Sequence, residues 1–111
     1  MTLTEMINES ERLSRLIDAG IESLVSASKD MAHAEHALRL ATAVAWAKAP
    51  SGTVPFKEAW VEAECAGEKL EFDLAESTRY NALEAVRSRR AQLSALQSIM
   101  AAHRAEAELA G

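Results

Sequence analysis

One short segment of this chain, from Pro50 to Pro55, holds both of its prolines and its only Ser-Gly pair. The long stretches on either side, residues 3–49 and 56–109, contain no proline, and each carries a single glycine. Because proline and glycine are the residues that most often end helices, both stretches are predicted to be helical and to fold back at the segment between them. The sequence therefore predicts an all-α fold, a long antiparallel helical hairpin with a first arm at about 3–49, a turn at 50–55 and a second arm at about 56–109.

The first arm carries a seam of apolar and small residues at alternating spacings of three and four, which is the spacing of coiled coils. The seam is Leu3, Met6, Ser10, Leu13, Ile17, Gly20, Leu24, Ala27, Met31, Ala34, Leu38, Ala41 and Ala45. Five further apolar residues widen it: Ile7, Leu16, Ile21, Val25 and Val44. A stripe of this width indicates contact with more than one neighbouring helix.

Local signals mark where each arm begins and where the first arm can bend. Residues 2–5, Thr-Leu-Thr-Glu, fit a capping box. Thr53 can cap the second arm, with Pro55 in the first turn, where a missing N–H costs no hydrogen bond. Gly20 and the serines that follow it up to Ser28 lower helix propensity, which leaves a kink or break open between those two residues.

The second arm has two apolar stripes. The first is Phe56, Trp60, Ala63, Gly67, Leu70 and Leu74, and the second is Leu83, Val86, Leu93, Leu96, Ile99 and Met100, interrupted by Arg90. The helical phase shifts between them, near Ser77 and Thr78. We expect a bend or a change of packing partner at that point.

Size and composition indicate self-assembly. The 111 residues form one domain, and two long arms cannot bury a deep core alone. The hairpin is therefore predicted to form homo-oligomers through coiled-coil-like seams. Trp46 and Trp60 flank the turn and are predicted to close it by packing together, with stacking on a nucleobase as the alternative. The candidate interface residues are Leu13, Ile17, Leu24, Met31, Leu38, Trp46, Trp60, Leu93 and Leu96.

Charge divides the second arm. Seven acids lie between residues 57 and 76 against two lysines, and five arginines lie between 77 and 104 against one glutamate, although the whole chain has a net charge of -5. The two patches can pair between copies, or with the first arm, and so fix the register. Alternatively, the arginines hold phosphates, and a ring of copies would join them into a basic track. The candidate nucleic-acid-binding residues are Arg79, Arg87, Arg89, Arg90 and Lys48.

No residue pattern indicates catalysis, so we expect a non-enzymatic protein without cofactor, metal or small-molecule substrate. His33 and His36 could share a helix face, but no third ligand is indicated nearby. Cys65 is the only cysteine and is expected to be a small buried residue. An apolar signal-peptide core and a membrane-spanning run are both lacking, which predicts a cytoplasmic protein with no membrane partner.

Three stretches resemble small helical proteins of tailed bacteriophages: residues 52–59, 70–76 and 83–98. The layout of the second arm also resembles the phage recombination-mediator family typified by UvsY, in which a long helix ends in an acidic-to-basic transition and a Ser-Arg element. Ser88 and Arg89 match that element. Where the family places basic residues ahead of the turn, this chain has Ala45-Trp46-Ala47-Lys48, with one lysine. The resemblance implies helical oligomers that bind single-stranded DNA and load a recombinase onto strands covered by single-strand-binding protein.

These observations lead to three functional hypotheses. The first is a phage accessory protein of DNA recombination or replication in the host bacterial cytoplasm, an oligomeric mediator that binds single-stranded DNA or loads a recombinase. The second is a phage inhibitor of a bacterial defence protein, with the acidic part of the second arm imitating a phosphate backbone. The third is a structural assembly adaptor.

Overall fold

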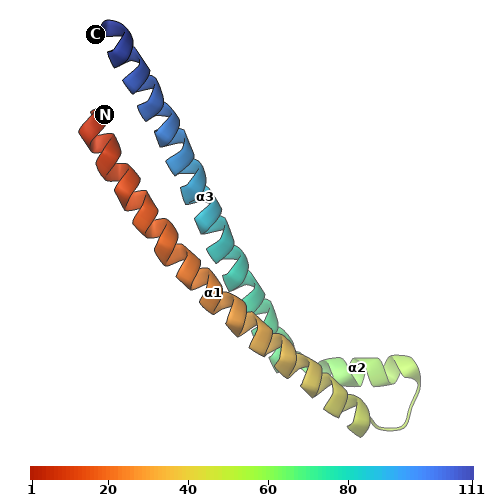
Figure 1. Cartoon of the computed structure of the whole chain (residues 1–111). Helices are drawn as coiled ribbons and strands as arrows, with labels where there is room; N and C mark the ends of the chain where they lie inside the picture. The colour runs from red at the N-terminus through yellow and green to blue at the C-terminus, as the bar shows by residue number, and fades with distance from the viewer. The chain divides into compact units, whose positions relative to one another are not determined.

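The computed structural model describes all residues from Met1 to Gly111 and contains three α-helices and no strand (Figure 1). Helix α1 spans Leu3–Lys48, α2 spans Val54–Glu64 and α3 spans Ala66–Ala110. The predicted all-α helical hairpin is confirmed, because α1 packs against the helices that follow the turn.

Both predicted helix starts are capped as the sequence indicates. The Thr2 hydroxyl accepts a hydrogen bond from the Glu5 N–H at 3.1 Å. The Thr53 hydroxyl accepts one from the Phe56 N–H at 3.4 Å, and Pro55 lies in the first turn of α2. Each hydroxyl satisfies one of the backbone donors that a helix N-terminus leaves without a partner.

Helix α1 continues without interruption from Gly20 through Ser28, so the break that the sequence left open does not occur. Gly20 is buried against Val86, and the Ser28 hydroxyl accepts a hydrogen bond from Nε of Arg79 at 3.1 Å. These contacts with α3 outweigh the low helix propensity of this part of α1.

The second arm is two helices and not the single helix predicted for residues 56–109, because Cys65 leaves helical geometry with φ -100° and ψ 9°. The interruption is one residue long. The Cys65 N–H still donates to the Val61 carbonyl at 3.0 Å, and the Lys69 N–H donates to the Cys65 carbonyl at 2.9 Å. Backbone hydrogen bonding therefore continues on both sides of the junction between α2 and α3.

The chain divides into two compact units. Unit 1 joins Met1–Leu24 to Asn81–Gly111, and unit 2 is Val25–Tyr80. Helices α1 and α3 contribute to both units, whereas α2 belongs to unit 2. Each unit has its own cluster of buried apolar side chains.

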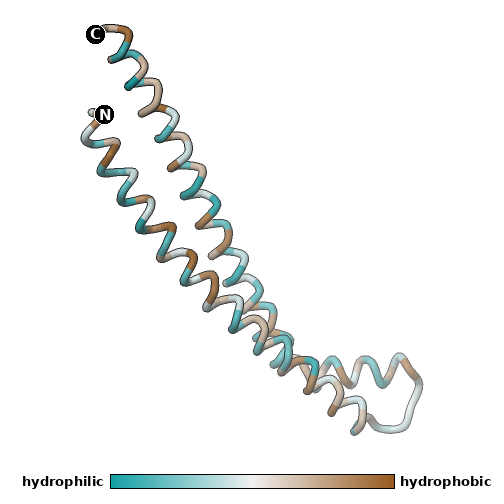
Figure 2. The backbone as a smooth tube through the Cα atoms, in the orientation of Figure 1, coloured by the Kyte–Doolittle hydropathy of each residue, from teal (hydrophilic) through white to brown (hydrophobic).

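Unit 1 is an antiparallel pair of helical segments in which both chain ends lie at the same end (Figure 1). Hydrophobic positions recur at intervals along both segments, separated by polar ones (Figure 2). Its cluster consists of Met6, Leu13, Leu96 and Met100, with Leu93 packed against it. This cluster brings the first turns of α1 against the last part of the α3 seam.

Unit 2 contains the turn, α2 and the adjoining parts of α1 and α3. Its cluster is formed by Ala45, Val61 and Cys65, with Leu38, Ala41 and Trp60 packed against it. Small side chains dominate this cluster, so the backbones of α1 and α2 can approach closely.

The predicted seam of α1 is confirmed, since every one of its positions except Leu3 is buried or half-buried. Four of the residues expected to widen it are exposed: Ile7, Ile21, Val25 and Val44. The seam is thus filled within one chain, and its apolar flank remains open.

Helix α3 carries one continuous seam with the same alternating spacing, so the shift of phase predicted near Ser77 and Thr78 is wrong. The seam begins at Cys65, just before α3, and its buried and half-buried members within α3 are Glu68, Phe72, Ala75, Arg79, Ala82, Val86, Arg89, Leu93, Leu96 and Met100. Three apolar residues assigned to the predicted stripes lie outside this seam and are exposed, namely Leu70, Leu74 and Ile99. The two helices therefore share one coiled-coil periodicity, with charged side chains at three α3 positions.

Candidate functional site

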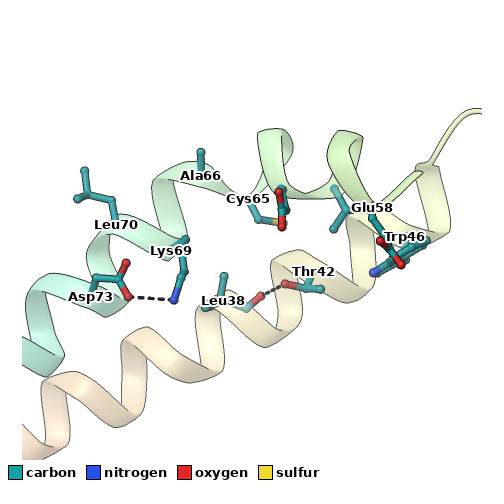
Figure 3. Close-up of a pocket in the computed structure, with 11 residues that line it drawn as sticks. Leu38, Thr42, Trp46, Glu58, Cys65, Ala66, Lys69, Leu70 and Asp73 are labelled. Carbon is teal, nitrogen blue, oxygen red and sulfur yellow. Dashed lines mark hydrogen bonds and ion pairs between the residues drawn. The ribbon is translucent and has the colours of Figure 1, made fainter. Parts of the chain in front are cut away.

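A groove with a volume of about 790 Å³ is present in unit 2, where all three helices contribute side chains (Figure 3). Its lining residues are Leu38, Thr42 and Trp46 of α1, Glu58, Val61 and Glu62 of α2, Cys65 at the junction, and Ala66, Lys69, Leu70 and Asp73 of α3. Cys65, the one residue that interrupts the second arm between α2 and α3, is thus part of the lining of the groove.

The floor of the groove is apolar and continuous with the unit 2 cluster. Val61 and Cys65 belong to both, and each is only 5% exposed. The Thr42 hydroxyl donates a hydrogen bond to the Leu38 carbonyl at 2.7 Å, which satisfies this polar group within α1 (Figure 3). The floor consequently offers no polar side-chain atom that lacks a partner.

Two large apolar side chains remain exposed at the rim. Trp46 is 43% exposed and lies beside Glu58 at one end of the groove, as Figure 3 shows. Leu70 is 59% exposed and lies near the other end. Large apolar side chains on a concave surface are typical of binding sites, because an occupant removes their area from water.

The charged residues of the groove are mostly acidic. Glu58 and Glu62 are exposed, one turn apart on α2, and neither forms an ion pair within the chain. The single cation, Lys69, is paired with Asp73 at 3.0 Å and lies 5.5 Å from the centroid of the Phe72 ring. The groove therefore carries two unpaired negative charges next to an apolar floor.

The structure separates the predicted nucleic-acid-binding residues into two groups. Arg79 and Arg89 are half-buried seam residues, while Arg87, Arg90 and Lys48 are exposed. Arg87 pairs with Glu84 at 2.9 Å, and Arg90 forms no ion pair within the chain. Of the predicted arginines, Arg87 and Arg90 are therefore the two with exposed side chains on α3.

The predicted interface residues are mainly packed inside the hairpin. Leu13, Ile17 and Leu96 are buried, while Leu24, Met31, Leu38 and Leu93 are half-buried. The two tryptophans have different surroundings, since Trp60 packs against the unit 2 cluster and Trp46 lines the groove. Surfaces outside the seam are thus the ones that a further molecule can contact.

The remaining polar candidates lie on exposed helix surfaces or in the unit 2 cluster. His33, His36 and His103 are exposed on their helices, and no three His, Cys, Asp or Glu side chains gather in an arrangement that could hold a metal ion. Cys65 is buried, as expected. In unit 1, hydrogen bonds from Arg12 hold the pKa of Glu9 below its usual value.

Sequence reasoning did not identify the groove. The sequence shows Glu58, Glu62 and Leu70 only as parts of an acidic run and an apolar stripe, and the walls of the groove come from separate parts of the chain.

Comparison of this chain with known protein families, with curated proteins and with solved structures gave no match. None of the helices has both the length and the apolar character needed to cross a membrane.

Proposed function

We propose that this chain is a non-enzymatic adaptor that binds a protein partner in the groove of unit 2. The observation that carries the proposal is the exposure of Trp46 and Leu70 beside the buried pair Val61 and Cys65. Burying apolar area stabilises a complex by about 25 cal/mol per Å², so covering two such side chains supplies part of a useful binding energy. The adaptor hypothesis from the sequence is the one that this geometry favours.

A site-specific photocrosslink in the native cell tests the adaptor function. A photoreactive amino acid in place of Leu70 should give a discrete crosslinked product with a second protein. The matched control is Ile99, which is exposed to a similar extent but lies in unit 1. Equal products from both positions, or none from the Leu70 position, would refute the groove as the binding surface.

Self-association remains a second property that we propose for the same molecule. The open flank of α1 includes Ile7 and Ile21 in unit 1, which are apolar and exposed. Covering them in a second copy would remove apolar area from water. Light scattering at micromolar concentration should give a mass above that of the monomer, and replacing both isoleucines with Ser should lower it to the monomer value.

Single-stranded DNA binding is the second candidate function. Arg87 and Arg90 are exposed and three residues apart on α3, so both can lie on one side of the helix. Arginine suits phosphate because its donors form a fixed fork. The recombination-mediator role implied by the family resemblance depends on this surface.

The DNA-binding candidate predicts sequence-independent binding that is weak even at low salt, because two phosphate contacts release few counterions, and that weakens further as salt rises. The double variant Arg87→Gln/Arg90→Gln should abolish it, while Arg15→Gln/Lys29→Gln, with the same change in charge, should not. Arg89 is left unchanged because it lies in the seam. DNA binding that survives the first double variant would exclude these arginines as the DNA surface.

A further inference from the structure

We infer that the occupant of the groove is an amphipathic helix of another protein, with basic side chains beside its apolar face. This inference rests on the adaptor function proposed above and specifies its partner. It follows from the shape of the apolar floor, the sign of the unpaired charges and the acidic character of this chain's own open flank.

The apolar part of the groove has the length of a short helix. Leu38, Thr42 and Trp46 follow one another at intervals of one turn along α1 and form one wall, about 12 Å long at 1.5 Å per residue. Leu70 lies near the end opposite Trp46 (Figure 3). A helix of two to three turns presents apolar side chains at matching intervals, as in other complexes where a helix binds in a groove.

The charges indicate that the occupant is basic. Glu58 and Glu62 form no ion pair within the chain, whereas Lys69, the cation of the groove, is paired with Asp73. An occupant with Lys or Arg next to its apolar face would pair with these glutamates at the rim, whereas an acidic one would be repelled. The acidic rim therefore selects among amphipathic helices that would otherwise fit the apolar floor equally well.

A second copy of this chain fits the groove poorly on the same argument. The open flank of α1 has Ile7 and Ile21 as its large apolar residues in unit 1. Glu11 and Asp18 lie one turn from them on the same side, and both are exposed. Seating this flank in the groove would bring acids against Glu58 and Glu62. A partner of opposite charge avoids this repulsion.

The two tryptophans provide a position-specific readout. In the variant Trp60→Phe the one remaining tryptophan is Trp46, in the groove, and in Trp46→Phe it is Trp60, in the cluster, so selective excitation of tryptophan reports on one position at a time. The probe is a synthetic amphipathic peptide of Leu and Lys about 18 residues long, long enough for five helical turns. Its counterpart has Glu in place of every Lys.

The Leu/Lys peptide should shift the emission of Trp46 to shorter wavelength, with saturation, and leave the emission of Trp60 unchanged. The Leu/Glu peptide should shift neither. The double variant Glu58→Gln/Glu62→Gln should weaken binding of the Leu/Lys peptide by about fivefold, in line with two rim ion pairs. The control Glu11→Gln/Glu22→Gln has the same change in charge in unit 1 and should bind as the parent does.

Five results would overturn the inference. Equal binding of the two peptides would show that the groove does not select basic helices. An equal loss of affinity in both double variants would show attraction to the whole acidic protein and not to the groove. If the Leu/Lys peptide does not bind but a crosslink forms at Leu70, the basic helix is rejected as the partner and the adaptor function is retained. A crosslink between two copies of this chain would also reject the inferred partner. Absence of both signals would remove both proposals.

Discussion

Gly20 of α1 and Val86 of α3 approach so closely in unit 1 that a Cβ on Gly20 would lie 2.9 Å from Cγ2 of Val86. The same Cβ would lie 3.7 Å from Nη1 of Arg89, and Val86 is only 2% exposed. Glycine at this position therefore lets the seam close over a fully buried side chain. Its cost in helix propensity is offset by packing.

The close approach predicts opposite effects of the same substitution at two glycines. Gly20→Ala should lower the melting temperature, because Val86 must move, although alanine alone would gain up to about 1 kcal/mol in helix propensity. Gly67→Ala, where the new Cβ meets no atom within 4 Å, should raise it. Adding Val86→Ala to the Gly20→Ala variant should lower the melting temperature less than Val86→Ala does in the parent chain. Equal stabilisation at both glycines would contradict the packing.

The seam of α3 predicts unequal costs at two apolar residues of one helix. Leu96 belongs to the unit 1 cluster, so Leu96→Ala should destabilise the fold by about 2–5 kcal/mol. Ile99 is 54% exposed, and Ile99→Ala should change stability by no more than about 0.5 kcal/mol. Urea unfolding measures both. Similar losses would mean that Ile99 is covered in solution, which is the result expected if a second copy packs there.

Replacing each of two adjacent arginines, Arg89 and Arg90, should likewise have unequal effects on the melting temperature. Arg89 is half-buried in the seam with its Nη1 next to Gly20, so Arg89→Gln, which shortens the side chain, should lower the melting temperature through lost packing. Arg90 is exposed and unpaired, so Arg90→Gln should leave it nearly unchanged. Circular dichroism melts of the two variants, which have equal net charge, provide the comparison. A larger loss at Arg90 would indicate that it is the seam residue.

The burial of Cys65 predicts slow thiol chemistry in the folded protein. Its side chain lies in the unit 2 cluster and is protected from reagents in water. A chromogenic disulfide reagent should react slowly with the native chain and rapidly in denaturant. Binding of the Leu/Lys peptide should slow the native reaction further, since Cys65 lines the groove. Equal rates in the native and denatured chains would show that the cluster opens readily.

The first arm was predictable because its seam consists of apolar and small residues, from Met6 to Ala45, so residue type and burial coincide. The helix starts were predictable for a similar reason, since Thr2 and Thr53 act through local hydrogen bonds. Both features depend on residues that are near one another in the sequence.

The second arm was harder to predict because residue type and burial do not coincide. Glu68, Arg79 and Arg89 occupy seam positions, while Leu70 and Leu74 lie outside. An apolar pattern therefore suggests a shift of phase where none exists. Long charged side chains can occupy a seam when their stems pack and small residues face them. The facing residues belong to α1, so the pattern of the second arm alone does not show where this happens.

The groove could not be predicted from local pattern at all. Its floor includes Cys65, the residue at which the second arm leaves helical geometry, and no proline marks that position. Its walls combine residues from before and after the turn, so the register of the hairpin decides which side chains meet. Sequence alone located the acids of the rim but not the apolar floor beneath them.

The shared spacing of the seams in α1 and α3 limits how such a chain can change in length during evolution. Inserting one residue in α1 rotates every later side chain by about 100° and moves the following seam residues toward solvent. A whole heptad preserves the phase, but α3 must then gain a heptad at the facing position to keep the turn closed. Homologous hairpins should therefore differ by paired heptads, one in each arm, and unpaired insertions should concentrate in the segment between α1 and α2.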